Sequence, residues 1–591
     1  MKRHITAALL ACGLLLTGCG AVRTEPLDRE PAAEGPVIAY VPLDDRPDNV
    51  ERVVYLAESL GYALELPEPV LYRTRLDGQP RNFDELQRGE PWSLCTWVLE
   101  QEAAGCDRYI LSLDQLHSGG LVSSRAMTED ELALPGGGHV SSSGLLEGLL
   151  AALAEDPNNT VWLLDSVMRL APTVGYEGGT LEEYNAIRAY GMEPREALAD
   201  EALTLENVLD SYRRGADGSA LLYGLEPGVL EANLAARERK LRLSDRVRQT
   251  LAQPGYGHFR VMIGIDDSSL EDCIQKNEIA YLRRGLRTGA DGRSLDWLLA
   301  GVDDLAFKAL VRLYLDETGW QGDTAAVRYY GGTEDRPACD YDFQPLTTVM
   351  AEHLALFGLT GSETGALQVL VLTQPADEAE KSGYYGALLQ DLRACREENR
   401  PVILIDAGNG RYGTAFHEAL TKETELGYLL SYAGFLDMAI VTGTALSHGV
   451  ARYAYLQSGA RGEAAERAFA RTLADSVIKD FCYKNVVRND LLTYIRSGLG
   501  GDPNNFWLPK IDLEAVQARL EQGMEDASVG VIRNLQRSNF FSPEPGGGRG
   551  WGGVALKNYR FPWDRAFEIG MDILLGEFTE PHEKVWGVYY R

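Results

Sequence analysis

The chain has 591 residues, of which 45% are hydrophobic and 24% are charged, the balance of an ordinary globular protein. Asp and Glu number 87 against 57 Lys and Arg, which gives a formal net charge of −30. Nucleic acid and anionic lipid faces repel a body of this charge, so the composition argues against nucleic acid as a partner.

The first residues have the pattern of an export signal. Lys2 and Arg3 give a positive start, and the apolar run Ile5–Leu16 is shorter than the about 20 residues that span a bilayer. The run ends in Leu16-Thr17-Gly18-Cys19, which resembles the bacterial lipobox, where a cysteine takes a lipid. We therefore predict a lipoprotein signal peptide at residues 1–19 and an extracytoplasmic protein anchored to a bacterial membrane through lipid on Cys19.

The rest of the chain divides into three parts by composition. Residues 20–36 are rich in Pro, Glu, Ala and Arg without an apolar period, as expected for a flexible tether. Residues 37–454 alternate apolar runs with segments of helical period, the pattern of parallel βα units. Residues 455–591 are predicted to be mainly helical, with strands of a small β cap at Val554–Phe561 and Val585–Tyr590.

Eight apolar runs in the second part are candidate strands. They are Val37–Leu43, Tyr109–Leu113, Val161–Leu164, Arg260–Ile265, Ala325–Tyr330, Gln368–Leu372, Val402–Ile405 and Met438–Val441. Their apolar character favours strands covered on both faces. We predict an α/β fold of parallel βα units. Eight strands would close a (β/α)₈-like barrel, and a doubly wound sheet or two tandem α/β domains fit the same pattern.

The cysteines argue against a zinc site. Beyond Cys19 they are Cys95, Cys106, Cys273, Cys339, Cys395 and Cys482. They form no CxxC pair and no cluster with histidine, which structural zinc sites need. We expect mostly free, buried thiols.

Polar residues follow five of the apolar runs. They are Asp44, Asp45, Arg46 and Asn49; Asp114, Gln115 and Arg125; Asp165; Asp266 and Asp267; and Asp406 and Asn409. The carboxyl ends of parallel strands meet at one edge, where α/β proteins place their sites. Asp and Asn also cap helices and set turns, which explains any single one equally well. Together they predict an acceptor-lined site for a polyol, an amino sugar or a cation.

The motif Leu43-Asp44-Asp45-Arg46-Pro47-x-Asn49 resembles the bacterial family catalogued as domain of unknown function 4127. The likeness continues through Gly119–Arg125, Gly264–Asp267, Asp406-x-x-Asn409-Gly410, Tyr432–Gly434 and Gly443–Ala445. This chain has Val302-Asp303-Asp304 where relatives carry Ala-Asp-Glu, and Phe435-Leu436-Asp437 where they carry Trp-Asn-Thr. The resemblance implies a family and no activity, because the family has none that is settled.

The leading functional hypothesis is a surface-anchored hydrolase of glycans, either amino-sugar polymers or cell-wall polysaccharides. Glycoside hydrolysis needs two carboxyl groups across one bond, one protonated and one ionised. We predict Asp44, Asp45, Asp266 and Asp267 as the catalytic candidates, with no cofactor. The predicted substrate-binding residues are Arg46, Asn49, Asp114, Gln115, Arg125, Asp165, Asp406 and Asn409.

Two alternatives remain open on sequence grounds. One is a hydrolase in which the aspartates hold Mg²⁺ or Ca²⁺ through oxygen ligands. The other is a carbohydrate-binding lipoprotein without catalysis. A serine nucleophile is disfavoured because no G-x-S-x-G occurs and Ser118 has no recognisable partner. A nucleotide site is disfavoured because Gly408-x-Gly410 has no third glycine in register and no P-loop lysine.

Overall fold

The computed structural model describes residues 35–76, 78–221, 227–290, 292–434, 438–460, 462–538 and 554–576, with the residue pairs 550–551, 578–579 and 589–590. The predicted signal peptide, the lipid site Cys19 and most of the predicted tether lie outside these residues. Among the helices described, none combines the length and apolarity that crossing a bilayer requires.

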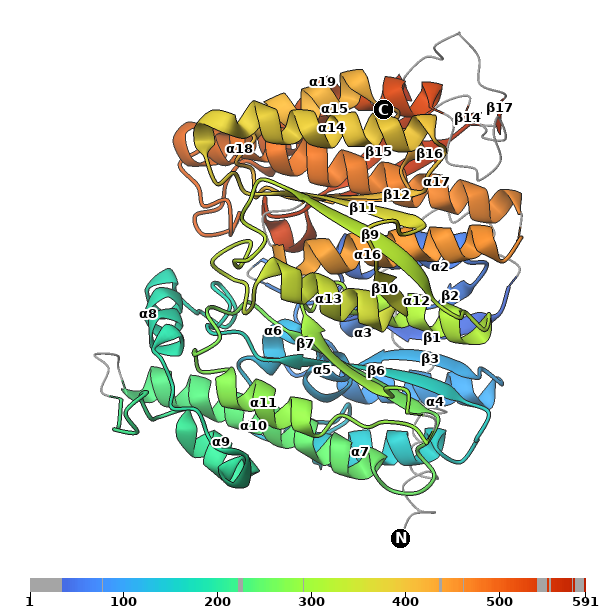
Figure 1. Cartoon of the computed structure of the whole chain (residues 1–591). Coiled ribbons are helices and arrows are strands. Elements are labelled where there is room, and N and C mark those ends of the chain that lie inside the picture. The colour runs from blue at the N-terminus through green and yellow to red at the C-terminus, as the bar shows by residue number, and fades with distance from the viewer. Residues whose placement is uncertain are drawn as a thin grey trace. The chain divides into compact units, whose positions relative to one another are not determined.

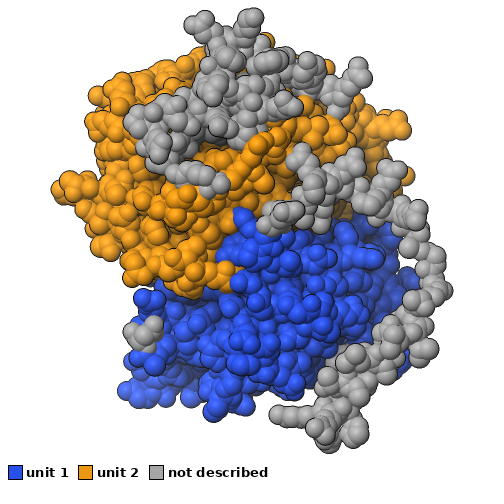
Figure 2. Space-filling model, turned by 90° about the vertical axis from the view of Figure 1, so that its right-hand side faces the viewer, with its two compact units in different colours: residues 1–45, 61–266, 271–298 blue, residues 46–60, 267–270, 299–591 orange. Residues whose placement is uncertain are grey.

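The chain forms two compact units, coloured separately in Figure 2. Unit 1 takes residues up to Asp45 together with 61–266 and 271–298. Unit 2 takes residues 46–60, 267–270 and 299–591. The region 37–454 is thus shared between the units, and the helical region from 455 onward belongs to unit 2.

The first sheet has six strands in the order β2-β1-β3-β6-β7-β8. Its strands are β1 (Val37–Val41), β2 (Ala63–Glu65), β3 (Arg108–Ser112), β6 (Thr160–Val167), β7 (Phe259–Ile265) and β8 (Asp296–Ala300). The pairings from β2 through β7 are parallel. Helices α4 (Pro91–Ala103), α7 (Ser142–Leu153) and α10 (Pro227–Leu251) pack beside this sheet (Figure 1). Parallel pairing and helical cover explain why the strands are apolar throughout.

The second sheet lies within unit 2 and has five parallel strands in the order β10-β9-β11-β12-β13. They are β9 (Asp323–Tyr330), β10 (Leu359–Gly361), β11 (Leu367–Thr373), β12 (Val402–Ala407) and β13 (Ser431–Gly434). Helices α14 (Lys381–Glu397) and α15 (Gly413–Glu423) cover one face in Figure 1. The other face carries α12 (Leu305–Glu317), α13 (Leu346–Leu356) and α16 (Met438–Gln457).

The C-terminal part of unit 2 is a run of helices followed by a small sheet. The helices are α17 (Glu463–Val477), a π-helical segment Ile478–Val487, α18 (Arg488–Thr493), a second π-helical segment Tyr494–Gly498, and α19 (Leu513–Arg537). Helix α2 (Glu51–Ser59), from the other end of the chain, packs along α17. The predicted strand Val554–Phe561 is found as β15 (Val554–Arg560), which pairs with β16 (Gly570–Leu575).

Shorter elements complete the description. They are α3 (Pro69–Tyr72), α5 (Leu113–Ser118), α6 (Leu121–Ser124), β4 (Glu131–Ala133), β5 (His139–Ser141), α8 (Leu181–Met192), α9 (Leu205–Ser211), α11 (Lys276–Arg284), β14 (Gly550–Trp551), β17 (Phe578–Thr579) and β18 (Tyr589–Tyr590). Strand β18 pairs with β15, and residues 585–588 of the predicted last strand lie outside the described residues.

The α/β fold of parallel βα units is confirmed, but the barrel is wrong. The strands form two separate sheets instead of one closed ring, so two α/β sheets in tandem is the arrangement found. A strand count cannot distinguish these, because closure depends on which strands pair at the edges. The eighth predicted strand, Met438–Val441, is also wrong: it is the first turn of α16, and the last strand of the sheet is β13. Short apolar runs of a buried helix and of a buried strand have the same pattern.

The six cysteines of the described region are free, and all but the partly exposed Cys106 are buried. This confirms the expectation from the sequence.

Candidate functional site

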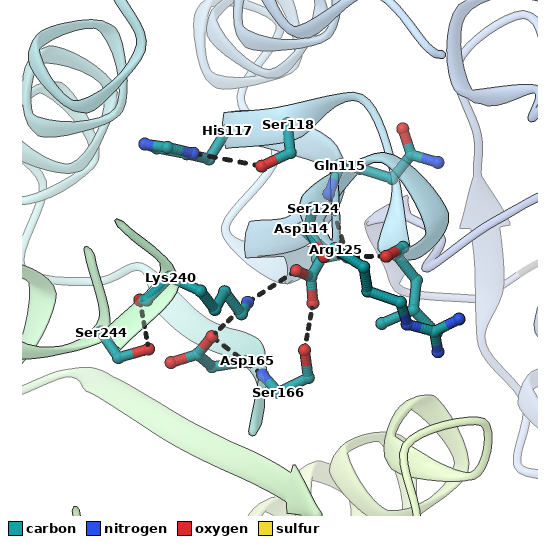
Figure 3. Close-up of polar contacts among 12 residues, drawn as sticks. Asp114, Gln115, His117, Ser118, Ser124, Arg125, Asp165, Ser166, Lys240 and Ser244 are labelled. Carbon is teal, nitrogen blue, oxygen red and sulfur yellow. Dashed lines mark hydrogen bonds and ion pairs between the residues drawn. The ribbon is translucent and has the colours of Figure 1, made fainter. Parts of the chain in front are cut away.

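Two predicted binding residues of unit 1 share one buried lysine. Lys240 Nζ, from α10, lies 2.6 Å from Asp114 Oδ1 and 2.9 Å from Asp165 Oδ1 (Figure 3). Ser166 Oγ donates to the other oxygen of Asp114 at 2.8 Å. Burial alone would lower the pKa of Lys240, but the two aspartates outweigh it and raise the pKa above its usual value. Since these side chains are all buried, the group is a closed ion-pair cluster in the interior of unit 1.

Three more predicted site residues of unit 1 form hydrogen bonds within that unit: Gln115, Arg125 and Asp45. Gln115 Nε2 donates to the carbonyl oxygens of Leu43 and Tyr72 and so fixes the loop after β1. Arg125 donates to Asp266 Oδ2 through Nε, at 3.1 Å, and through Nη2. Asp45 Oδ1 accepts the backbone N–H of Thr74 at 3.1 Å. These contacts are structural.

Three of the four catalytic candidates, Asp44, Asp45 and Asp266, lie in unit 1 and do not follow neighbouring strands. Strands β3 and β6 lie between β1, which precedes Asp44 and Asp45, and β7, which precedes Asp266. Three strand spacings amount to roughly 14 Å, whereas the two carboxyl groups of a glycosidase lie about 5–9.5 Å apart. Asp267 belongs to unit 2. The correction is that the first and fourth predicted strands are not neighbours, because the second and third, β3 and β6, pair between them.

A serine–histidine–aspartate contact that the sequence did not reveal occurs in α5 and its surroundings. His117 Nδ1 lies 3.2 Å from Ser118 Oγ, and Nε2 lies 3.2 Å from Asp130 Oδ1. However, Arg239 Nη1 contacts the same Nδ1 at 2.7 Å and so occupies the lone pair that a general base needs. Burial and this arginine lower the pKa of His117 to about 4, and both His117 and Ser118 are inaccessible. The arrangement is structural.

In unit 2, Asp406 and Asn409 shape the turn after β12. Asp406 Oδ1 accepts the N–H of Gly408 at 3.1 Å, and its Oδ2 lies 3.2 Å from His417 Nε2. Asn409 adopts a left-handed conformation with φ of 48°, which asparagine tolerates better than most residues. Asp406 thus holds the turn and pairs with His417 of α15, and Asn409 takes the left-handed position of the same turn.

A pocket opens in unit 2 at the carboxyl end of β13. The centres of water-sized groups can occupy about 10 Å³ of it, and the empty space is about 280 Å³ when the open solvent at its mouth is included. The lining residues are Asp48, Arg52, Asp303, Phe307, Ala433, Ile440, Val441, Thr444 and Asp480. They come from the turn before α2, from the loop between β8 and α12, from α2, α12, β13 and α16, and from the π-helical segment. The carboxyl edge of a parallel sheet is where open α/β folds bind ligands.

Two of the lining carboxyl groups share one arginine. Arg52 Nη1 lies 3.0 Å from Asp48 Oδ1 and 3.6 Å from Asp480 Oδ1. Arg52 Nε pairs with Asp475 at 3.2 Å. Asp480 Oδ2 accepts the backbone N–H of Gly434 at 3.3 Å, while its Oδ1 is buried without a hydrogen bond within the described structure.

Two further buried charged side chains, Lys479 and Glu568, contact Asp48. Lys479 Nζ contacts Asp48 Oδ1 at 2.8 Å and Glu568 Oε1 at 3.4 Å. The same Glu568 oxygen accepts the backbone N–H of Asp48 at 3.1 Å. All these side chains are buried, so their charges interact through a medium that screens less than water.

The environment pushes the pKa values of the carboxyl groups apart. Burial raises the pKa of Asp480 to about 6, and repulsion by Asp48 adds to this against the pull of Arg52. Burial and repulsion by Asp48 likewise raise the pKa of Glu568 to about 7. For Asp48, burial would raise the pKa, but Lys479 and Arg52 hold it well below its ordinary value. Near neutral pH the pocket therefore offers one ionised carboxylate beside one carboxyl group able to hold a proton.

The backbone at this site is unusual. Lys479 and Asp480 lie in the π-helical segment Ile478–Val487. π-helical turns are rare and occur frequently at functional sites. From this segment Lys479 contacts Asp48 in the turn Pro47–Asn49, and Asp480 lies 3.6 Å from Arg52 of α2.

Two predicted binding residues, Arg46 and Asn49, flank the pocket residue Asp48 in the chain but do not line the pocket themselves. Arg46 forms a two-pronged ion pair with Asp303, a pocket residue, and stacks over Trp563 at 4.8 Å. Asn49 is buried in the turn and donates its backbone N–H to the Arg46 carbonyl at 2.9 Å. The departure Phe435–Asp437 lies outside the described residues.

The sequence patterns did not single out Arg52, Asp480 or Glu568. Glu568 lies 520 residues from Asp48, and Asp480 lies far along the chain in a helical region. The available signal was a charged pair, Lys479-Asp480, set among apolar residues of a helix, which is costly unless partners exist.

The donor set does not resemble a metal centre. Within the described ranges, no three His, Cys, Asp or Glu side chains come together as a metal site requires. The carboxylates of the pocket instead face the cations Arg52 and Lys479.

Glu568→Gln should change the pH dependence of stability. The folded protein holds a proton on Glu568 up to about pH 7, while the unfolded chain releases it near 4.5, so its contribution to stability falls as pH rises through this window. The glutamine side chain does not ionise, so the stability of the variant does not fall for this reason as pH rises. Relative to wild type, it should gain about 3 kcal/mol between pH 4.5 and 8. Denaturant unfolding at several pH values measures this, and a difference that does not grow with pH would contradict the assignment.

No curated protein and no solved structure matches the chain. Residues 38–572 match the family described as "Protein of unknown function (DUF4127)". This range includes every residue of the pocket and the buried charges behind it. The match covers nearly the whole chain and confirms the resemblance seen in the motifs. The protein belongs to the DUF4127 family.

Proposed function

We propose that the protein is a glycan hydrolase whose acid–base pair is Asp48 and Asp480. One observation carries the proposal. The two carboxyl groups line one pocket and share Arg52 Nη1, yet their environments lower one pKa and raise the other. Carboxyl pairs with separated pKa values are the pattern of acid and base assignments in glycosidases.

In the proposed reaction Asp480 is the general acid. It gives its proton to the glycosidic oxygen as the bond to the sugar carbon breaks, and the ionised Asp48 stabilises the positive charge that develops on the sugar. Water supplies the hydroxyl group to the sugar carbon, and its remaining proton returns to the pair. Phe307 and Ile440 supply an apolar wall, which suits the hydrophobic face of a sugar ring.

Turnover tests the proposal directly. The purified protein should release reducing ends from one of four polymers: peptidoglycan glycan strands, chitin, chitosan or cellulose. A parallel assay with EDTA, followed by added Mg²⁺ or Ca²⁺, tests the divalent-cation alternative. Binding to a polymer without release of reducing ends would favour the non-catalytic alternative and reject the hydrolase.

We also propose that the protein acts outside the cytoplasm, tethered through lipid on Cys19. The motive is the lipobox-like sequence before Cys19. Cys19→Ser should shift the protein from the membrane pellet to the soluble fraction, because the thiol that takes the lipid is gone. Fractionation in high salt measures this. If the variant still sediments with membranes in high salt, the anchor lies elsewhere.

A further inference from the structure

The pocket of unit 2 has room for one small group beyond its mouth. The centres of water-sized groups can occupy about 10 Å³ of it, whereas the space that includes the open mouth is about 280 Å³. A cavity needs roughly 10–15 Å³ to hold one water molecule, so a space of this size admits a small substituent and not a whole sugar ring. A sugar that binds here therefore lies in the open part of the pocket and directs one substituent inward.

The described residues that line the pocket favour a cation over an anion. Three of them carry carboxyl groups, Asp48, Asp303 and Asp480, and one carries a permanent positive charge, Arg52. The side chain of Asp303 is 17% exposed, against 8% for Asp48, 4% for Arg52 and 3% for Asp480. The most accessible charged group of the lining is therefore a carboxylate, and the guanidinium group is almost fully covered.

Asp303 lies beside an aromatic residue of the same lining. It precedes α12 by two residues, and the first turn of that helix carries Phe307. Arg46 binds both carboxylate oxygens of Asp303. Because a carboxylate has about four lone-pair sites, this ion pair does not prevent Asp303 from accepting a hydrogen bond from a ligand. An aromatic ring such as that of Phe307 attracts an ammonium group placed over its face.

Among the common substituents of glycans, the primary ammonium group of an unacetylated amino sugar suits these features best. It donates three hydrogen bonds and carries a positive charge, whereas a hydroxyl group donates one and carries none. An acetamido group is larger and uncharged, and a sugar carboxylate would face the carboxyl groups of the lining. The attraction between an ammonium group and Asp303 is stronger here than in water, because the partly buried pocket screens charge less.

We propose that Asp303 binds the primary ammonium group of an amino sugar and that the substrate is a glycan of unacetylated amino sugars. This inference rests on the proposed function and narrows it to one class of polymer. It selects chitosan from the four polymers of the turnover assay.

Binding of three short sugars tests the inference. Calorimetry in an Asp480→Asn background, which prevents turnover, compares chitotriose, tri-N-acetylchitotriose and cellotriose at pH 6, where a primary amine is protonated. Chitotriose should bind about tenfold or more tightly than the other two, because it alone offers a charged donor. Adding Asp303→Asn should lower the affinity for chitotriose by about the same factor and leave the affinity for cellotriose unchanged. Asp303→Glu, which keeps the charge, should keep part of the preference.

Asp391→Asn is the matched control. Asp391, on α14, also pairs with an arginine, Arg328, at 2.8 Å, and is partly exposed. It is not among the described residues that line the pocket. Its amide variant should keep the affinity for chitotriose and the preference for it. If Asp303→Asn fails to fold, the preference between sugars with Asp303 intact and the result for Asp303→Glu still decide.

The inference is overturned if chitotriose binds no more tightly than cellotriose, if Asp303→Asn keeps the preference, or if none of the three sugars binds. The proposed function fails separately. Preferential binding of chitotriose through Asp303 without release of reducing ends from any polymer would reject the hydrolase and keep this inference. Turnover of chitin or cellulose as fast as that of chitosan would keep the hydrolase and overturn this inference.

Discussion

Asp480→Asn should lower glycan turnover by about 10²–10⁴-fold while the protein stays folded. The amide keeps the shape of the side chain and can still accept the Gly434 N–H, which lies 3.3 Å from Oδ2. It cannot donate an acidic proton to the leaving oxygen. Initial rates on the best polymer, measured beside the melting temperature, give the effect.

The control for this variant is Asp490→Asn. Asp490 lies on α18, close in sequence to Asp480, but it is exposed and pairs with Arg519. Its amide variant should keep wild-type turnover. Near-normal turnover in Asp480→Asn would remove Asp480 from the reaction, and equal losses in both variants would point to a general effect on folding.

Arg52→Ala should cost about 3–5 kcal/mol of stability at neutral pH, the penalty for leaving buried charge without its partner. Arg52 faces Asp48, Asp475 and Asp480, and all four side chains are buried. The loss should shrink toward acid pH, since protonated carboxyl groups no longer need the cation. Denaturant unfolding at pH 7.5 and pH 5 measures both effects.

Arg393→Ala provides the comparison. Arg393 is 44% exposed and pairs with Glu423 at 2.5 Å on the surface of unit 2. Exposed ion pairs contribute about 0–1 kcal/mol, so its loss should be small at either pH. If Arg52→Ala costs no more than Arg393→Ala, the buried cluster does not depend on the arginine.

Local patterns predicted the strands of both sheets well where the apolar run was long. The runs at Arg260–Ile265, Gln368–Leu372 and Val402–Ile405 coincide with β7, β11 and β12 within two residues at each end. Strands β11 and β12 are buried along their whole length, and β7 is buried at every residue except Arg260. A nearly continuous apolar run is therefore the physical signature of a covered strand.

The order of strands and the pocket could not be predicted in the same way. Nothing local shows that β3 and β6 separate β1 from β7, because pairing depends on contacts between distant segments. The contact of Lys479 with Asp48 spans 431 residues. The strand-end aspartates Asp114 and Asp165 have the same local pattern as a binding residue, yet their partner Lys240 makes them structural.

Arg46 and Asn49 show what the motif did reveal. Both were predicted as binding residues; neither lines the pocket, but Arg46 pairs with the pocket residue Asp303. Their neighbour Asp48, in the same turn, lines it. The motif marks a turn that brings a carboxylate to the site, but its partners come from the other end of the chain.

The pH dependence of kcat/KM tests the assignment of Asp480 as general acid most directly, since this quantity reports the pKa values of essential groups in the free enzyme. A general acid must be protonated to act, and the pKa of Asp480 is raised to about 6. We predict that kcat/KM falls as pH rises above about 6, and that this decline disappears in the residual activity of Asp480→Asn. A profile that is flat from pH 5 to 8, or a decline that persists in Asp480→Asn, would contradict the account.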